Sequence, residues 1–299
     1  MFRRILMALL VLVCALAVLL YCALADNDAR PAIGERRIAQ SGELQIHYFS
    51  SGEKTATPVV LLPSYARSAS DFNELINKLN LAGYRTLAVQ PRGIDGSDLS
   101  SLNITYHDLA ADLAAVLDAE NFKSSVSIVA HAFGNRVART FAKDYPNRSH
   151  QLILLAAGGE EPTPADVSSA IMKAVFGIFP DSQRREAVAF AFFAKASEVP
   201  NYWMNGWYPL AGLAQGNATA ASTTEATNPR WAEGGNDQIV ILQPDEDAAA
   251  EHGAASLLER FPQRVSVHLI KDAGHAILPE QPEQVASLVV GALDGTLVQ

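Results

Sequence analysis

The chain has 299 residues, of which 49% are hydrophobic and 18% are charged, so it can fill a sizeable core in one large domain or in two. Its formal net charge is -9, and no basic run follows the first few residues, which argues against a nucleic-acid-binding surface. We therefore expect an acidic exported protein or a soluble enzyme that acts on, or binds, a small molecule.

The N-terminal segment has the organisation of a targeting sequence. Two arginines precede an apolar run from Ile5 to Leu20, and an A-x-A sequence ends at Ala25. This pattern predicts a signal peptide over residues 1–25 and export to the periplasm or the medium. The alternative is a membrane anchor over residues 5–22, because the apolar stretch is close to the roughly 18 residues that a spanning helix needs. Contact with a membrane is expected only through this segment, if it is not cleaved.

After a polar linker that ends near Glu35, short apolar runs alternate with stretches of helical periodicity. The strands are expected at Leu44–Phe49, Val59–Leu62, Tyr84–Val89, Ser125–Ala130, Leu152–Ala156, Ile239–Leu242 and Val265–Ile270. Helices are expected around Phe72–Leu79 and Leu109–Leu117, from Phe133, near Ala249–Arg260 and from Pro279. The first strand alternates apolar and polar residues like a half-buried antiparallel strand. The rest of the pattern predicts a mostly parallel sheet with helices on both faces.

An aromatic-rich stretch interrupts this alternation. All three tryptophans and five of the twelve phenylalanines lie between Gly159 and about Gly235. One interpretation is a helical insertion whose rings pack only its own small core. The other is a cap over the carboxyl edge of the sheet, where open α/β folds bind ligands, and aromatic lining would then indicate a mainly apolar pocket. The expected division is a core over 36–158, a cap over 159–235 and a second core part over 236–295.

The middle of the chain has a strand, a sharp turn and a helix around Ala132. The sequence Ala130-His131-Ala132-Phe133-Gly134 resembles the nucleophile elbow G-x-S-x-G of the α/β-hydrolase family. Ala130 replaces the first glycine, and Ala132 replaces the serine. Alanine has no nucleophilic atom, so the usual acyl-enzyme route is closed at this position. His131 is expected to be structural.

The resemblance covers roughly residues 36 to 295 and implies an eight-stranded, mostly parallel α/β-hydrolase sheet with a helical cap. Leu62-Pro63-Ser64-Tyr65 follows a strand where the family has H-G-x, which implies that the backbone N–H of Tyr65 donates to an oxyanion hole. Phe133 follows the nucleophile position and implies the second donor. The segment Gln90–Ser97 is similar to the structural D-x-R-G-x-G-x-S turn of the family.

Two late segments resemble those that carry the acid and base of the family. Gln243-Pro244-Asp245-Glu246-Asp247 follows a strand and implies Asp247 as the acid. Asp272-Ala273-Gly274-His275 implies His275 as the base, and the order of elbow, acid and base is that of the family. The competing positions for the acid are Asp245, Glu246, Glu160 and Glu161.

A base and an acid without the serine leave several functions open. His275 could activate water or the substrate directly, in a hydrolase-type site for a small, largely apolar substrate. Ser64 is a possible alternative nucleophile. A non-catalytic pseudohydrolase that binds a small apolar ligand is the alternative class, and Ala132 could also be an engineered change. Metal-binding and nucleotide-binding motifs are absent, so neither a metal nor another cofactor is expected.

Overall fold

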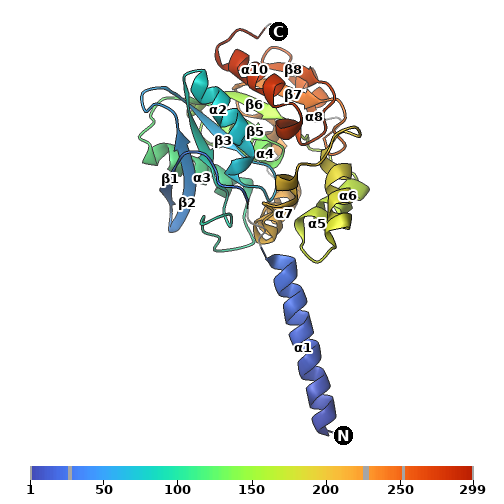
Figure 1. The fold of residues 1–299 in the computed structure, drawn as a ribbon. Helices are drawn as coiled ribbons and strands as arrows, with labels where there is room; N and C mark the ends of the chain where they lie inside the picture. The colour runs from blue at the N-terminus through green and yellow to red at the C-terminus, as the bar shows by residue number, and fades with distance from the viewer. Residues whose placement is uncertain (1, 26–28, 225–228, 251–252, 298–299) are drawn as a thin grey trace.

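The computed structural model describes residues 2–25, 29–224, 229–250 and 253–297. These residues form one sheet of eight strands in the order β1-β2-β4-β3-β5-β6-β7-β8 (Figure 1). The strands are β1 (Glu35–Ser41), β2 (Leu44–Ser51), β3 (Thr57–Leu62), β4 (Tyr84–Val89), β5 (Val126–His131), β6 (Ser149–Leu155), β7 (Gln238–Pro244) and β8 (Val265–Ile270). Strands β1 and β2 pair antiparallel, as do β2 and β4, whereas all pairs from β4 to β8 are parallel. The expected mostly parallel, eight-stranded sheet is confirmed.

Helices cover both faces of the sheet, and its central strands are therefore buried on both sides, as is usual for parallel sheets. The helices of the core are α2 (Asn73–Leu81), α3 (Tyr106–Ala119), α4 (Phe133–Asp144), α8 (Gly253–Arg260), α9 (Ile277–Glu280) and α10 (Pro282–Leu293). Helices α3 and α4 pack Leu113 and Phe141 into one core, and α2 and α10 pack Ile76 and Val289 into the core on the opposite face. The carboxyl ends of the parallel strands therefore meet at one edge of a closed three-layer structure.

A group of helices lies between β6 and β7 in the chain and forms the lower right of the molecule in Figure 1. It contains α5 (Ala165–Val175), α6 (Asp181–Phe192) and α7 (Pro209–Thr224), together with the short 3₁₀ helices η2 (Asn201–Met204) and η3 (Pro229–Glu233). Its buried aromatic residues include Trp203 and Trp207, and they share a cluster with Ala276 of the core. The rings therefore pack against the core as well as against each other.

Three details differ from the sequence-based expectation. Strand β1 was not expected from the sequence, where a polar linker was expected to end near Glu35. It was missed because Ala39 is its only fully buried side chain, so its polar residues hide the alternation that marks a strand. Helix α8 begins at Gly253 in the described residues, later than expected. The last helix does not start at Pro279, which lies inside α9. Instead, α10 starts at Pro282, the position where proline is well tolerated in a helix.

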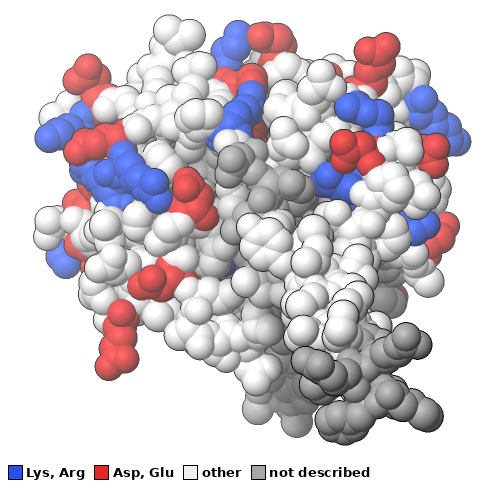
Figure 2. All heavy atoms as spheres, turned by 60° about the horizontal axis from the view of Figure 1, so that its bottom comes forward, with Lys and Arg blue, Asp and Glu red and all other residues white. Residues whose placement is uncertain are grey.

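Helix α1 (Phe2–Leu24) projects from the molecule beside the helices of the β6–β7 insertion (Figure 1). Its described side chains form an uncharged column, while basic and acidic residues are mixed over the rest of the face in Figure 2. Among the residues that the structure describes, no helix combines the length and the apolar character needed to cross a membrane.

Candidate active site

The turn between β5 and α4 places Ala132 at the carboxyl edge of the sheet. Ala132 has φ 48° and ψ -108°, a backbone conformation that is strained for a residue with a Cβ. Its N–H donates to the carbonyl of Leu155 in β6 at 3.0 Å, and Asn135 Nδ2 donates to the same carbonyl at 3.0 Å. The neighbouring strand therefore holds both sides of the turn. The strained geometry is present although the residue has no nucleophilic atom.

Gly134 lets the first turn of α4 lie against the end of β3. A Cβ at this position would stand 2.8 Å from the carbonyl oxygen of Pro63 and would meet the carbonyl of Leu62. Both contacts are with backbone, which cannot move aside without shifting the loop after β3. Gly134 thus fixes how closely the Ala132 turn approaches the Pro63–Tyr65 loop.

His275 and Asp247 face each other from the loops after β8 and β7. Nδ1 of His275 lies 3.0 Å from Oδ1 and 3.1 Å from Oδ2 of Asp247, and both residues are buried. Asp247 Oδ1 also accepts the N–H groups of Ala249 and Ala250. Burial acts to raise the pKa of Asp247, but the charge and hydrogen bond of His275 and the two N–H groups outweigh it and lower that pKa. A carboxylate at Nδ1 orients the imidazole and leaves Nε2 for a substrate or a water molecule.

The other acidic candidates make different contacts. Asp245 accepts the N–H of Ala273 at 3.4 Å, and Glu246 accepts the N–H of Lys195 at 3.1 Å. Glu160 pairs with Arg260 at 3.2 Å, and Glu161 is exposed. Of the five acidic positions considered after β7 and β6, Asp247 is the one that the structure brings to His275. The catalytic roles of the pair remain predictions.

His131, the residue before Ala132, connects the elbow to the His275 loop. Its Nε2 donates to the carbonyl oxygen of His275 at 2.7 Å, and the two rings have centroids 5.7 Å apart. Burial is the main reason that the pKa of His131 falls to about 4, so the ring is neutral near pH 7. His131 thus places the backbone of His275 next to Ala132.

The loop after β3 carries Tyr65, and helix α4 begins with Phe133. In the part of the chain that the structure describes, neither backbone N–H donates to a protein acceptor, although Ala66 N–H is bound by Gln215 Oε1 at 2.7 Å. The Tyr65 and Phe133 rings meet edge to face with centroids 6.2 Å apart, and burial raises the pKa of Tyr65 to about 12. A cavity of about 30 Å³ lies behind this loop, with Pro63, Phe133 and Gln215 in its wall. Both N–H groups are therefore available to a ligand, and their role as oxyanion donors stays a prediction.

Ser64 lies in the same loop and is 1% exposed. Its carbonyl oxygen accepts the N–H of Arg67 at 3.2 Å, which closes a turn. Of the hydrogen bonds that the structure describes, none joins its hydroxyl to His275. The structure therefore gives Ser64 a place in a turn and does not bring it to the base.

Aromatic residues of the β6–β7 insertion cover the site. The ring of Phe192, at the end of α6, lies 5.9 Å from the ring of His275 and 5.4 Å from that of Trp207. Arg67 of the Tyr65 loop points its guanidinium at Trp203 and Trp207, with centroid distances of 4.4 and 4.6 Å. Ala132 and His275 are each 8% exposed.

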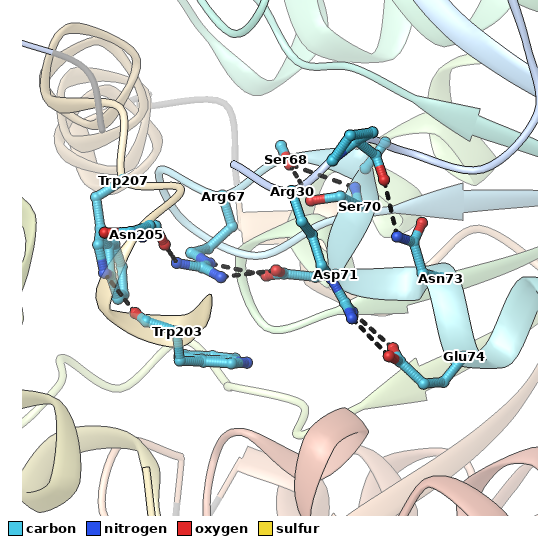
Figure 3. A network of polar contacts seen from close by, with 12 residues as sticks. Arg30, Arg67, Ser68, Ser70, Asp71, Asn73, Glu74, Trp203, Asn205 and Trp207 are labelled. Atoms are coloured by element: carbon cyan, nitrogen blue, oxygen red, sulfur yellow. Dashed lines mark hydrogen bonds and ion pairs between the residues drawn. The ribbon is translucent and has the colours of Figure 1, made fainter. Parts of the chain in front are cut away.

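Arg67 also joins the loop to the insertion through polar contacts (Figure 3). Its Nε and Nη2 donate to the two carboxylate oxygens of Asp71 at 2.8 and 2.7 Å, and its Nη1 donates to the carbonyl of Asn205 at 2.6 Å. Nearby, Arg30 forms a similar two-point pair with Glu74 at 2.5 and 2.6 Å. The pair with Asp71 fixes the direction of the Arg67 guanidinium, and the bond to Asn205 joins the Tyr65 loop to the insertion.

The residues around the site do not form a metal centre. Among the described residues, no group of three or more His, Cys, Asp or Glu side chains could hold a metal ion. His275 and Asp247 bind each other instead. What the geometry offers is an oriented imidazole, two N–H donors and an apolar cover.

A comparison with protein families agrees with this geometry. The family model described as the alpha/beta hydrolase family matches residues 59–288. The chain belongs to this family. The strained turn at Ala132 resembles the nucleophile elbow of this family, and the assignment of Ala132 to the nucleophile position stays a prediction.

Two curated relatives match this α/β-hydrolase over part of their length. It is 30% identical to a non-heme chloroperoxidase of Streptomyces lividans over 120 residues, which cover 40% of this chain and 44% of the relative. It is 31% identical to a 2-hydroxy-6-oxononadienedioate/2-hydroxy-6-oxononatrienedioate hydrolase of Paraburkholderia xenovorans over 125 residues, or 41% and 43% of the two chains. The chain spans less than half the length of these relatives.

Solved structures of esterases share the fold. Naproxen esterase from Bacillus subtilis has a TM-score of 0.70 at 18% identity, with 88% of this chain and 92% of that chain covered. An esterase from Rhodococcus sp. also has a TM-score of 0.70, at 20% identity, and covers 88% and 99%. A membrane phospholipase A has a TM-score of 0.66 at 17% identity and covers 98% and 99%. At these identities the likeness concerns the fold alone.

Sequence reasoning missed several residues of this α/β-hydrolase site. Arg67 and Asp71 are four residues apart in the loop after β3, a spacing that permits an ion pair, but the two tryptophans that cover Arg67 are more than 130 residues away. The role of Gln215 in holding Ala66 has no sequence signal that we recognise. Glu280, five residues after His275, was assigned no role from the sequence.

Proposed function

We propose that this protein is an exported α/β-hydrolase with a hydrolytic site for a small, largely apolar substrate, in which His275 acts without a serine nucleophile. The observation that carries the proposal is the buried His275–Asp247 pair beside the strained Ala132 turn. A decayed site has no need to keep a buried acid and histidine, which cost free energy to desolvate. The aromatic cover supports an apolar substrate.

In the proposed reaction, Nε2 of His275 takes a proton from a water molecule, whose oxygen attacks the carbonyl carbon of the substrate. The N–H groups of Tyr65 and Phe133 stabilise the negative oxygen, and the protonated His275 returns the proton to the leaving group. General-base help of this kind is worth roughly 10²- to 10⁴-fold. Turnover of ordinary esters is therefore expected to be slow.

A second candidate is a pseudohydrolase that binds a small apolar ligand. The low exposure of Ala132 and His275 beneath Phe192 favours it, because an enclosed apolar site retains a ligand well. The buried His275–Asp247 pair favours the hydrolase, since a receptor has no use for an oriented base.

The deciding experiment restores the missing atom. Initial rates on short-chain aryl esters are compared for the parent chain, Ala132→Ser, and Ala132→Ser combined with His275→Ala. If the acid, base and oxyanion donors are preserved, Ala132→Ser hydrolyses these esters well above the parent chain and the double variant loses the gain. Equal rates for all three proteins would favour the binding protein, and a gain that survives loss of His275 would identify another base.

Export is the second part of the proposal, and the arginines, apolar run and A-x-A sequence of residues 1–25 support it. The mass of the chain recovered from the producing cells should correspond to a start after Ala25. An intact chain that begins at Met1 in the membrane fraction would establish the anchor instead.

A further inference from the structure

The end of α6 packs directly against the loop that carries His275. We call residues 192–195 the cap edge segment. A Cβ at Gly274 would stand 2.6 Å from the carbonyl carbon of Phe193 and 2.7 Å from the nitrogen of Ala194. Gly274 therefore allows a backbone-to-backbone approach that another residue would prevent. The backbone of the insertion thus packs directly against the backbone of the His275 loop at this point.

Glu280 joins the two sides of this contact. Its Oε1 accepts the N–H of Ala194 in the cap edge segment, and its Oε2 accepts the N–H of Gly274 next to His275, both at 2.8 Å. Hydrogen bonds from N–H groups to a carboxylate are about twice as strong as neutral ones. One side chain thus uses its two oxygens to hold two segments that are 80 residues apart.

Three hydrogen bonds hold backbone groups on either side of the His275 side chain. Besides the Gly274 N–H, the N–H of Ala276 donates to the carbonyl of Phe192 at 2.6 Å, and the carbonyl of His275 accepts Nε2 of His131. Two of these three bonds involve the cap edge segment or the carboxylate that binds it. A displacement of the cap edge segment would therefore change the position of the His275 backbone.

We propose that Glu280 is a positioning residue that couples the insertion to His275, so that the imidazole is aligned with Asp247 only while the cap edge segment is in place. The coupling deepens the proposed function and rests on His275 as its base. The carboxylate oxygens of Glu280 accept the N–H groups of Ala194 and Gly274. Glu280 acts through the backbone on either side of His275.

The first test observes the base without any turnover. Proton NMR on the full chain detects the low-field Nδ1–H of His275 that is bonded to Asp247. Glu280→Gln keeps the size of the side chain but leaves one N–H without an acceptor, and we expect this resonance to shift or broaden beyond detection. The matched control is Glu283→Gln, three residues further on, whose carboxylate is exposed and pairs with Lys78 at 2.7 Å. It should leave the resonance unchanged.

The second test separates positioning from folding. In the Ala132→Ser background, Glu280→Gln should lower kcat about tenfold with little change in KM, because small misplacement of a base slows the chemical step. Glu280→Asp retains the charge but is too short to bridge both N–H groups, so it should also lower kcat with little change in KM. This variant replaces Glu280→Gln in the test if the Gln variant does not fold.

An unchanged His275 resonance in a folded Glu280 variant would overturn the coupling. So would a change that the Glu283→Gln control reproduces. If Ala132→Ser proves inert, the proposed hydrolysis fails, but the NMR comparison still decides the coupling.

Discussion

Acidification should destabilise this protein in part through a buried imidazole, that of His131. His131 is 0% exposed, and burial, aided by the nearby His275, lowers its pKa from 6.5 to about 4. The folded state thus binds a proton less readily than the unfolded state. The stabilising contribution is fully present above pH 6.5 and is lost as the pH falls from about 6.5 to about 4. The gap between these pKa values corresponds to a loss of about 3 kcal/mol of unfolding free energy.

Urea unfolding at pH 7 and pH 4.5 measures this contribution. The comparison protein is His131→Gln, because the amide nitrogen of glutamine can replace Nε2 as the donor to the His275 carbonyl but does not titrate. Between the two pH values the natural chain should lose about 2–3 kcal/mol more than the variant, since most of the transition lies above pH 4.5. An equal loss in both proteins would refute the assignment of the pH dependence to His131.

Two further substitutions test the strained elbow. Ala132→Gly should stabilise the fold by up to about 1 kcal/mol, because relief of roughly 1–3 kcal/mol of strain exceeds the lost methyl burial and the added chain entropy; a lower midpoint in urea would contradict the strain. Gly134→Ala should destabilise the chain by about 2 kcal/mol or more, because its Cβ would meet the carbonyls of Leu62 and Pro63; thermal unfolding at an unchanged temperature would exclude this clash.

The central part of the fold was predictable because its signals are local. Strands such as Val59–Leu62 are continuous apolar runs, and the change from strand to helical spacing marks the turn at Ala132. The order of the elbow, Asp247 and His275 also singled out the pair that the structure brings together. Each of these features is contained in a short segment.

The unpredicted features depend on contacts between distant segments or on a weak pattern. Strand β1 is polar and is defined by its pairing with β2, as in Ile38 opposite His47. The Arg67–Trp203 contact and the Glu280–Ala194 bond require knowledge of where the insertion lies over the core. A single sequence contains the residues of such contacts but not their geometry.

The buried Arg67–Asp71 pair has a consequence for how the protein unfolds. Removing the β6–β7 insertion from the core would expose the indoles of Trp203 and Trp207 and would leave Arg67 without its acceptor at Asn205. We therefore expect no stable intermediate in which the insertion has separated from a core whose Tyr65 loop is still folded. The insertion and the sheet are therefore expected to unfold as one cooperative unit.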